Sequence, residues 1–220
     1  MPTTVTPQVR FRTIEGVQIR YADSGGPQKP TVLLTSPWPE SVYAFAPDVG
    51  TAAALFAAAA HPDRIASAIV GTGGAAVPIQ LGEPLASWVL DPDVEKYRRM
   101  DPRVIVGAAV DTIAGGVPAD IRDDYLSCYD GDRFVESMRY VRRYPEELPV
   151  LAELLPQIAT PVTIINGRND RVVPLANAEF LDERLPTSRL VVIDAGHFVW
   201  EEAPAEYASI ILDSIAELHT

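Results

Sequence analysis

Strand-like and helix-like segments alternate along much of this 220-residue chain, and this alternation limits the fold more than any other feature. A continuously apolar run such as residues 31–35 is expected to be a strand buried on both faces. The alanine-rich run at 51–61 favours a helix. Alternating strands and helices predict the α/β fold class, with a mostly parallel sheet flanked by helices. Further strands are expected at 8–14 and 17–23 (a hairpin), 64–70, 161–165 and 190–193, and further helices at 175–185 and 206–218.

The middle of the chain follows a different pattern. Between residues 77 and 158 the sequence breaks into short helical segments that prolines and glycines separate. Such a stretch is most simply an insertion of helices into a sheet domain. We therefore expect residues 1–76 and 159–220 to form one α/β core and residues 77–158 to form a helical lid. The helices of this lid are expected at 83–90, 93–100, 104–113, 121–129, 134–143 and 146–155.

Composition excludes several classes of protein. Of the residues, 47% are hydrophobic, which is too many for an intrinsically disordered chain. The net charge of −12 argues against nucleic acid or an anionic membrane surface as a partner, because phosphate groups repel it. The single cysteine, Cys128, permits neither an internal disulfide nor a thiolate metal site. The first residues lack the features of a secretion signal, so we expect a cytoplasmic protein without metal or cofactor.

Three candidate catalytic residues follow expected structural elements at the places where α/β sheets carry their sites. Asp48 is the centre of the pattern Ala46-Pro-Asp-Val-Gly50, directly before the alanine-rich helix. Small residues two positions away on either side are typical of a nucleophile elbow, because the central residue sits in a strained turn. Asp170 and His197 each follow a later strand.

Each of these residues alone also has a structural explanation. Asp48 fits a helix N-cap, a common position for aspartate. Asp170 fits a turn, and a lone histidine such as His197 is more often structural than catalytic. Their order along the chain favours catalysis, because nucleophile, acid and histidine follow one another in this order in the α/β-hydrolase fold.

The chain resembles the α/β-hydrolase superfamily, in its epoxide hydrolase and haloalkane dehalogenase branch, over most of its length. Residues 33–41, LLTSPWPES, look like the family's strand-end motif, usually His-Gly-x-Pro-Glu-Ser. Residues 48–65 resemble the elbow, its helix and the exit from that helix. Residues 166–174 and 196–204 look like the acid and histidine loops, and the helical middle resembles the lid.

This resemblance implies a catalytic triad of Asp48, Asp170 and His197. An aspartate nucleophile attacks a saturated carbon and forms an alkyl-enzyme ester. Water activated by His197, which Asp170 orients, then hydrolyses the ester. The backbone N–H groups of Trp38 and Val49 are implied to form the oxyanion hole.

The resemblance also implies a lid residue and a substrate class. The segment at 138–142, MRYVR, is loosely similar to the family's Asn-Trp-Tyr-Arg-Asn, which assigns the epoxide-polarising hydroxyl to Tyr140. The implied partners are a small apolar organic substrate and water, and a homodimer is left open. Two alternative functions remain open. In the first the chain is a dehalogenase, and in the second it is a catalytically inactive relative that serves as a binding or structural module.

The chain departs from the family's pattern in three places. Ser36-Pro37 replaces the usual His-Gly, and Val49 stands where many members carry tryptophan. Only seven positions separate Ser41 from Asp48, where the family has several dozen residues. Either the chain has an internal deletion before the elbow, or a segment is left out of the given sequence. Residues 42–46 are the one candidate for the strand that enters the elbow.

An alternative explanation is that Ala46-Pro47-Asp48 belongs to the end of an earlier strand, where the family often reads Ala-Pro-Asp. We prefer the elbow, because the alanine-rich helix follows without interruption.

Overall fold

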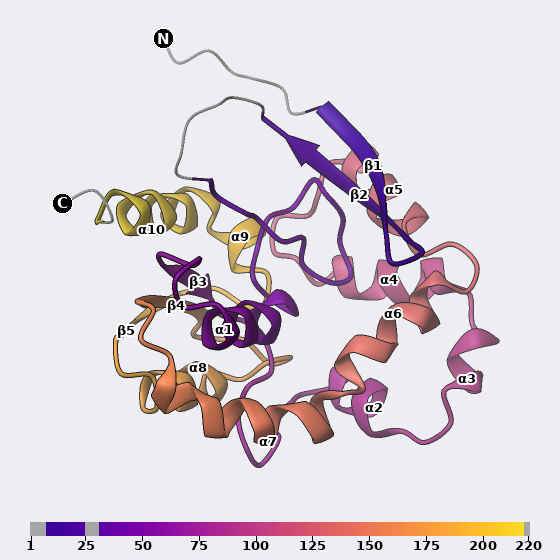
Figure 1. The fold of residues 1–220 in the computed structure, drawn as a ribbon. Helices are drawn as coiled ribbons and strands as arrows, with labels where there is room; N and C mark the ends of the chain where they lie inside the picture. The colour runs from indigo at the N-terminus through magenta and orange to yellow at the C-terminus, as the bar shows by residue number, and fades with distance from the viewer. Residues whose placement is uncertain (1–7, 25–30, 218–220) are drawn as a thin grey trace, which may run out of the picture.

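The computed structural model describes residues 8–24 and 31–217, which contain two separate sheets: a parallel sheet flanked by helices and a hairpin at the edge of the molecule (Figure 1). Strands β1 (Gln8–Ile14) and β2 (Val17–Asp23) pair as an antiparallel hairpin. Strands β3 (Ala68–Val70), β4 (Val162–Gly167) and β5 (Ser188–Ile193) form a parallel sheet in the order β3-β4-β5. The expected hairpin and these three parallel strands are confirmed.

Helices cover the parallel sheet on both sides. Helix α1 (Gly50–Ala60) packs against β3, and α8 (Ala176–Asp182) packs against β4 and β5. Helix α10 (Pro204–Ala216) follows the short α9 (Val199–Glu202) and lies across the sheet from α8 (Figure 1). Central strand β4 is buried along its whole length, as is usual for parallel strands that helices cover on both faces.

The helical middle of the chain is confirmed as a series of short helices. Their ends differ from the expected ones by a few residues because caps and prolines fix them locally, as Asp101 does by accepting the Arg103 N–H at the start of α4. The helices are α2 (Leu85–Leu90), α3 (Glu95–Arg98), α4 (Pro102–Val110), α5 (Ala119–Ser127), α6 (Arg133–Val141), α7 (Tyr144–Leu154) and a 3-10 turn at Leu155–Gln157.

An aromatic cluster joins this helical middle to the loop after residue 35. The Trp38 ring stacks on Phe134 of α6, with centroids 5.5 Å apart, and meets the edge of Trp88 of α2 at 5.2 Å. The hairpin also attaches to the helical middle, because the Arg20 guanidinium donates two hydrogen bonds of 3.0 Å to the Asp124 carboxylate of α5.

Two expected strands are absent from the structure. Residues 31–35 are irregular, and the side chain of Leu33 is 88% exposed. Residues 42–46 form a turn and an irregular segment rather than a strand entering the elbow. An extended segment becomes a strand only when a neighbour pairs with its backbone, and β3 pairs with β4 alone among the described residues.

Within residues 8–24 and 31–217, no helix combines the length and apolar character that crossing a bilayer requires.

Candidate active site

Asp48 occupies a strained turn immediately before α1. Its φ is +36°, a left-handed conformation that is rare for residues other than glycine. The turn is tightly enclosed, because a Cβ added to Gly50 would lie 2.7 Å from the Thr35 hydroxyl oxygen. The N-cap of α1 is Val49, without a side-chain cap, so the interpretation of Asp48 as an N-cap is wrong. The geometry is that of a strained elbow without its entering strand.

The two carboxylate oxygens of Asp48 have different environments. Oδ2 accepts a hydrogen bond of 2.7 Å from the Trp38 N–H, and the Val49 backbone also bonds to the carboxylate. Oδ1 lies 3.8 Å from His197 Nε2. The residue is only 4% exposed. Burial raises the pKa of Asp48, although the His197 charge and the two backbone bonds oppose the shift.

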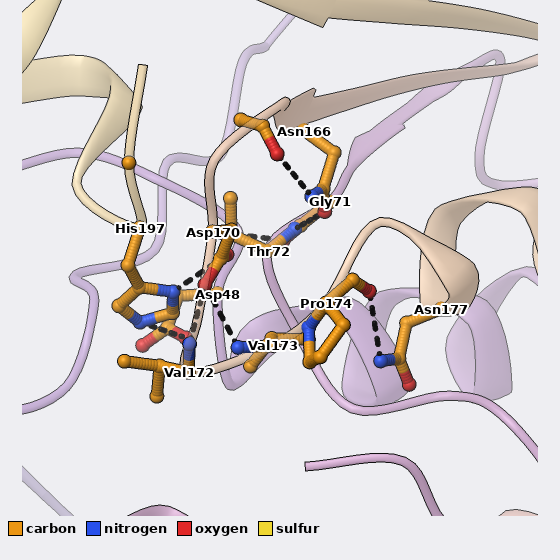
Figure 2. Close-up of polar contacts among 12 residues, drawn as sticks. Asp48, Gly71, Thr72, Asn166, Asp170, Val172, Val173, Pro174, Asn177 and His197 are labelled. Carbon is orange, nitrogen blue, oxygen red and sulfur yellow. Dashed lines mark hydrogen bonds and ion pairs between the residues drawn. The ribbon is translucent and has the colours of Figure 1, made fainter. Parts of the chain in front are cut away.

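His197 is held by Asp170, so the structure brings the three expected triad residues together (Figure 2). Asp170 Oδ2 lies 2.8 Å from His197 Nδ1. Its Oδ1 accepts the N–H groups of Val172 and Val173 at 2.9 and 2.8 Å, which fixes the carboxylate in one orientation (Figure 2). Nε2 of His197 is thereby directed toward Asp48.

The electrostatic surroundings of His197 favour its charged form. Burial opposes the imidazolium, but the hydrogen bond and charge of Asp170, with the charges of Asp48 and Glu40, outweigh it and raise the pKa of His197. A histidine held between carboxylates takes up a proton readily, which is the requirement for a general base.

Two asparagines that sequence reasoning missed position the loops around the triad. The Asn166 Oδ1 accepts the Thr72 N–H at 3.1 Å, and the Asn177 Nδ2 donates to the Pro174 carbonyl at 3.0 Å (Figure 2). Asn177 Oδ1 also accepts the N–H groups of Ala75 and Ala76, at 2.9 and 3.0 Å. Asn166 belongs to the segment that resembles the acid loop, but no role was assigned to it there, and Asn177 belongs to no recognised motif. The burial of both side chains is what identifies them.

Asp48 and His197 line a cavity of about 1020 Å³ between the α/β core and the helical middle. Its walls are mainly apolar and aromatic. A volume of this size and a lining of this kind are typical of small-molecule sites. The walls include Trp38, Trp88, Tyr97, Val104, Ile105 and Tyr144.

The structure does not bring Tyr140 into this cavity. Its side chain is partly exposed and its hydroxyl bonds to the backbone of Ala53 in α1. Tyr144, four residues later, lines the cavity instead, as does Tyr97. The Tyr140 and Tyr144 rings touch edge to face, with centroids 6.0 Å apart. Tyr140 lies near the end of α6 and Tyr144 at the start of α7, and the sequence match does not show which of the two side chains faces the cavity.

The indole N–H of Trp38 is also directed away from Asp48. It donates a hydrogen bond of 2.8 Å to the Ser137 hydroxyl in α6. A halide at the nucleophile therefore finds no indole donor from Trp38, and nothing in this geometry favours the dehalogenase alternative. Among the residues that the structure describes, no cluster of three His, Cys, Asp or Glu side chains is arranged to hold a metal ion.

Comparisons with known proteins place these features in a family. A model of the alpha/beta hydrolase fold matches residues 38–204. A 2-hydroxy-6-oxononadienedioate/2-hydroxy-6-oxononatrienedioate hydrolase from Pseudomonas putida is 28% identical over 183 residues, which cover 79% of this chain and 62% of the relative.

Solved structures resemble the fold at lower identity. An esterase from Thermogutta terrifontis is similar with a TM-score of 0.61 and 23% identity, over 79% of this chain and 64% of its own. A 2-hydroxy-6-oxo-6-phenylhexa-2,4-dienoate hydrolase from Rhodococcus has a TM-score of 0.53 and 20% identity, over 77% and 62%. The chain thus spans about three fifths of the length of these relatives. With a family match over most of its length, and with three parallel strands flanked by helices, this chain belongs to the α/β hydrolase fold family.

Proposed function

We propose that this protein is a hydrolase of the epoxide hydrolase type, in which Asp48 forms an alkyl-enzyme ester that His197-activated water hydrolyses. The observation that carries the proposal is that the two carboxylate oxygens of Asp48 have different contacts. Oδ2 sits on the Trp38 N–H, whereas Oδ1 faces His197 and the cavity. One oxygen is thus free to attack a substrate while the other is already held by backbone donors.

This arrangement argues against chemistry on an acyl carbon. In acyl transfer the backbone donors of the oxyanion hole bind the carbonyl oxygen of the substrate. Here the carboxylate of Asp48 itself accepts the hydrogen bond from the Trp38 N–H, so this donor is not available to a substrate carbonyl. The same donor is well placed for an ester on Asp48, because Oδ2 becomes the oxyanion when water attacks the carboxyl carbon.

The first proposed step opens the epoxide. Asp48 Oδ1 attacks a ring carbon, the C–O bond of the ring breaks, and the alkoxide takes a proton from a hydroxyl in the cavity. Tyr144 is the donor that we assign to this step, since it lines the cavity and lies close enough to Asp48 for the charge of Asp48 to raise its pKa. Burial raises the pKa of Tyr144 well above its ordinary value, so the hydroxyl stays protonated until the alkoxide forms.

The second proposed step hydrolyses the ester. His197 Nε2 takes a proton from water, and the oxygen attacks the carboxyl carbon of Asp48. The tetrahedral oxyanion on Oδ2 is stabilised by the Trp38 and Val49 N–H groups. The intermediate then collapses, the bond to the diol oxygen breaks, and the proton on His197 passes to that oxygen. The second proton of the water stays on the new carboxyl group of Asp48 and returns, through solvent in the cavity, to the Tyr144 phenolate, which restores both groups.

The cavity supports an apolar organic substrate. Its aromatic and aliphatic walls leave few polar groups apart from the triad and the tyrosine hydroxyls. We propose that residues 77–158 act as the lid over this cavity, since α2, α3 and α4 supply part of its wall. The relatives with similar sequences are named hydrolases of oxo-dienedioates, which supports a hydrolase and leaves the substrate to experiment.

A single turnover in ¹⁸O-labelled water tests the proposal. With enzyme in excess over an apolar epoxide, we expect an unlabelled diol and one labelled oxygen in the peptide that carries Asp48. Mass spectrometry should also detect the alkyl ester before it is hydrolysed. Label that enters the diol in the first turnover means that water attacks the substrate directly, and the proposal is then wrong. Release of halide from chloroalkanes would favour the dehalogenase alternative instead.

A further inference from the structure

Glu40 is a buried carboxyl group for which the proposed mechanism has no use. The residue is 3% exposed and follows Trp38 by two positions. Its Oε2 accepts a hydrogen bond of 2.8 Å from the Trp200 indole, whereas its Oε1 is inaccessible to solvent and lacks a hydrogen-bond partner in the described part of the chain. An ionised carboxylate with an unpaired oxygen is costly to bury, so this position calls for an explanation.

The surroundings of Glu40 connect it to the triad. The Trp200 ring that binds its carboxyl group packs edge to face against the His197 imidazole, with centroids 6.1 Å apart. The main-chain carbonyl of Glu40 accepts the Tyr129 hydroxyl of α5 at 3.1 Å. The titratable groups whose charges act on Glu40, or on which Glu40 acts, are Asp48, His197, Tyr125, Tyr129 and Glu201.

These surroundings make Glu40 neutral in the resting protein. Burial raises its pKa to about 8; the bond from Trp200 and the charge of His197 lower it, while the charges of Glu201 and Asp48 raise it further. Esterification removes the charge on Asp48, because it turns this carboxylate into a neutral group, and His197 gains a proton only in the following step.

We propose that Glu40 is a positioning residue for ester hydrolysis: its carboxyl group is neutral while Asp48 is a carboxylate, and it becomes a carboxylate beside His197 once Asp48 is esterified. The inference rests on the proposed function. Loss of the Asp48 charge lowers the pKa of Glu40, and the proton is released to bulk water. The new negative charge then stabilises the imidazolium that forms when His197 takes a proton from water.

The first test needs no substrate. The variant Asp48→Asn mimics the uncharged ester, and Glu40 is the one glutamate that is buried among the described residues. In protein labelled with ¹³C-glutamate, the infrared band of the protonated carboxyl group is followed against pH. We expect a midpoint near 8 in the wild-type protein and a midpoint at lower pH in Asp48→Asn. Asp194→Asn, an exposed acid at the rim of the same cavity, is the control and should leave the midpoint unchanged.

A third variant checks the assignment of the band. Trp200→Phe removes the one hydrogen bond that the carboxyl group of Glu40 accepts, so the midpoint should move to higher pH. A band that does not respond to Asp48→Asn overturns the proposal, whatever the protein catalyses.

The second test is kinetic and uses Glu40→Gln, which keeps an acceptor for Trp200 but cannot ionise. Ester formation should stay within about threefold of wild type, and ester hydrolysis should slow about tenfold. The variant should also lose the rise in hydrolysis rate that accompanies ionisation of Glu40. Asp194→Asn is again the matched control, since this exposed acid bonds to the Asn169 side chain.

The outcomes of the kinetic test separate the two proposals. Absence of an ester on Asp48 in the wild-type protein refutes the proposed function alone, because the infrared titration does not depend on turnover. An ester that Glu40→Gln hydrolyses at the wild-type rate and with the wild-type pH dependence refutes the inference about Glu40 and leaves the proposed function standing.

Discussion

Replacing Asp170 with asparagine separates the two proposed chemical steps. In the structure Asp170 Oδ2 lies 2.8 Å from His197 Nδ1, so the charge centres of the carboxylate and the imidazolium are about 4 Å apart. With an effective dielectric constant of about 20, their attraction is worth about 4 kcal/mol. Since about 1.4 kcal/mol corresponds to a factor of ten in rate, Asp170→Asn should slow proton transfer to His197 about a thousandfold.

The first step should not share this loss. Ester formation needs Asp48 as a carboxylate, and the charge of Asp170 raises the pKa of Asp48 rather than lowering it. Removing this charge therefore leaves Asp48 ionised and ready to attack. The expected result for Asp170→Asn is a normal rate of ester formation, followed by an ester that persists about a thousand times longer than in the wild-type protein.

Rapid-quench mass spectrometry of the Asp48 peptide measures both rates in one experiment. Asp194→Asn is the matched control, because this exposed acid lies on the same histidine loop and bonds only to the Asn169 side chain among the contacts described. If Asp170→Asn slows ester formation as much as hydrolysis, or slows hydrolysis less than tenfold, the assignment of Asp170 as the partner of a general base is wrong.

Three further predictions concern the cavity, the sheet and pH. Tyr144→Phe should slow epoxide opening about a hundredfold, as loss of a donor to a developing oxyanion does, whereas Tyr140→Phe, whose hydroxyl faces α1, should change the single-turnover rate less than threefold. Gly71→Ala should cost more than about 3 kcal/mol in urea unfolding, because its Cβ would lie 1.7 Å from a carbonyl of β4, while Gly115→Ala, with open space around it, should cost about 1 kcal/mol; equal losses would contradict the packing argument. Glu40 keeps its proton up to about pH 8 in the folded protein but loses it near pH 4.5 when the chain is unfolded. The stability of the wild-type protein should therefore fall as pH rises through this window. Glu40→Gln cannot titrate, so its free energy of unfolding should rise relative to that of wild type by on the order of 3 kcal/mol between pH 5 and 8.

The parts of the fold that depend on local pattern were predictable from sequence. The hairpin, the alanine-rich helix and the helical middle follow from periodicity and composition, and the loops of Asp170 and His197 follow from their strands. Residues 31–35 have the composition of a buried strand, yet strand formation depends on a neighbouring strand, and no described strand pairs with this segment.

The triad residues of the candidate site were predictable because they follow one another along the chain in the order that the fold family uses. Order alone indicated Asp48, Asp170 and His197, and the structure brings them within hydrogen-bonding or near-hydrogen-bonding distance. Tyr144 and Glu40 were not identified, because the direction of a helix face and the depth of a side chain are properties of packing. A glutamate in a loop gives no sign in the sequence that one of its oxygens will be buried without a partner.

The attachment of the amino-terminal hairpin has a mechanical consequence. Strands β1 and β2 share no backbone ladder with the parallel sheet, and Arg20 ties them to Asp124 of α5. Displacement of α5 therefore pulls on the hairpin, whereas the parallel sheet can stay still. A spin label on the exposed turn of the hairpin at Glu15 would therefore report any displacement of α5 relative to the parallel sheet.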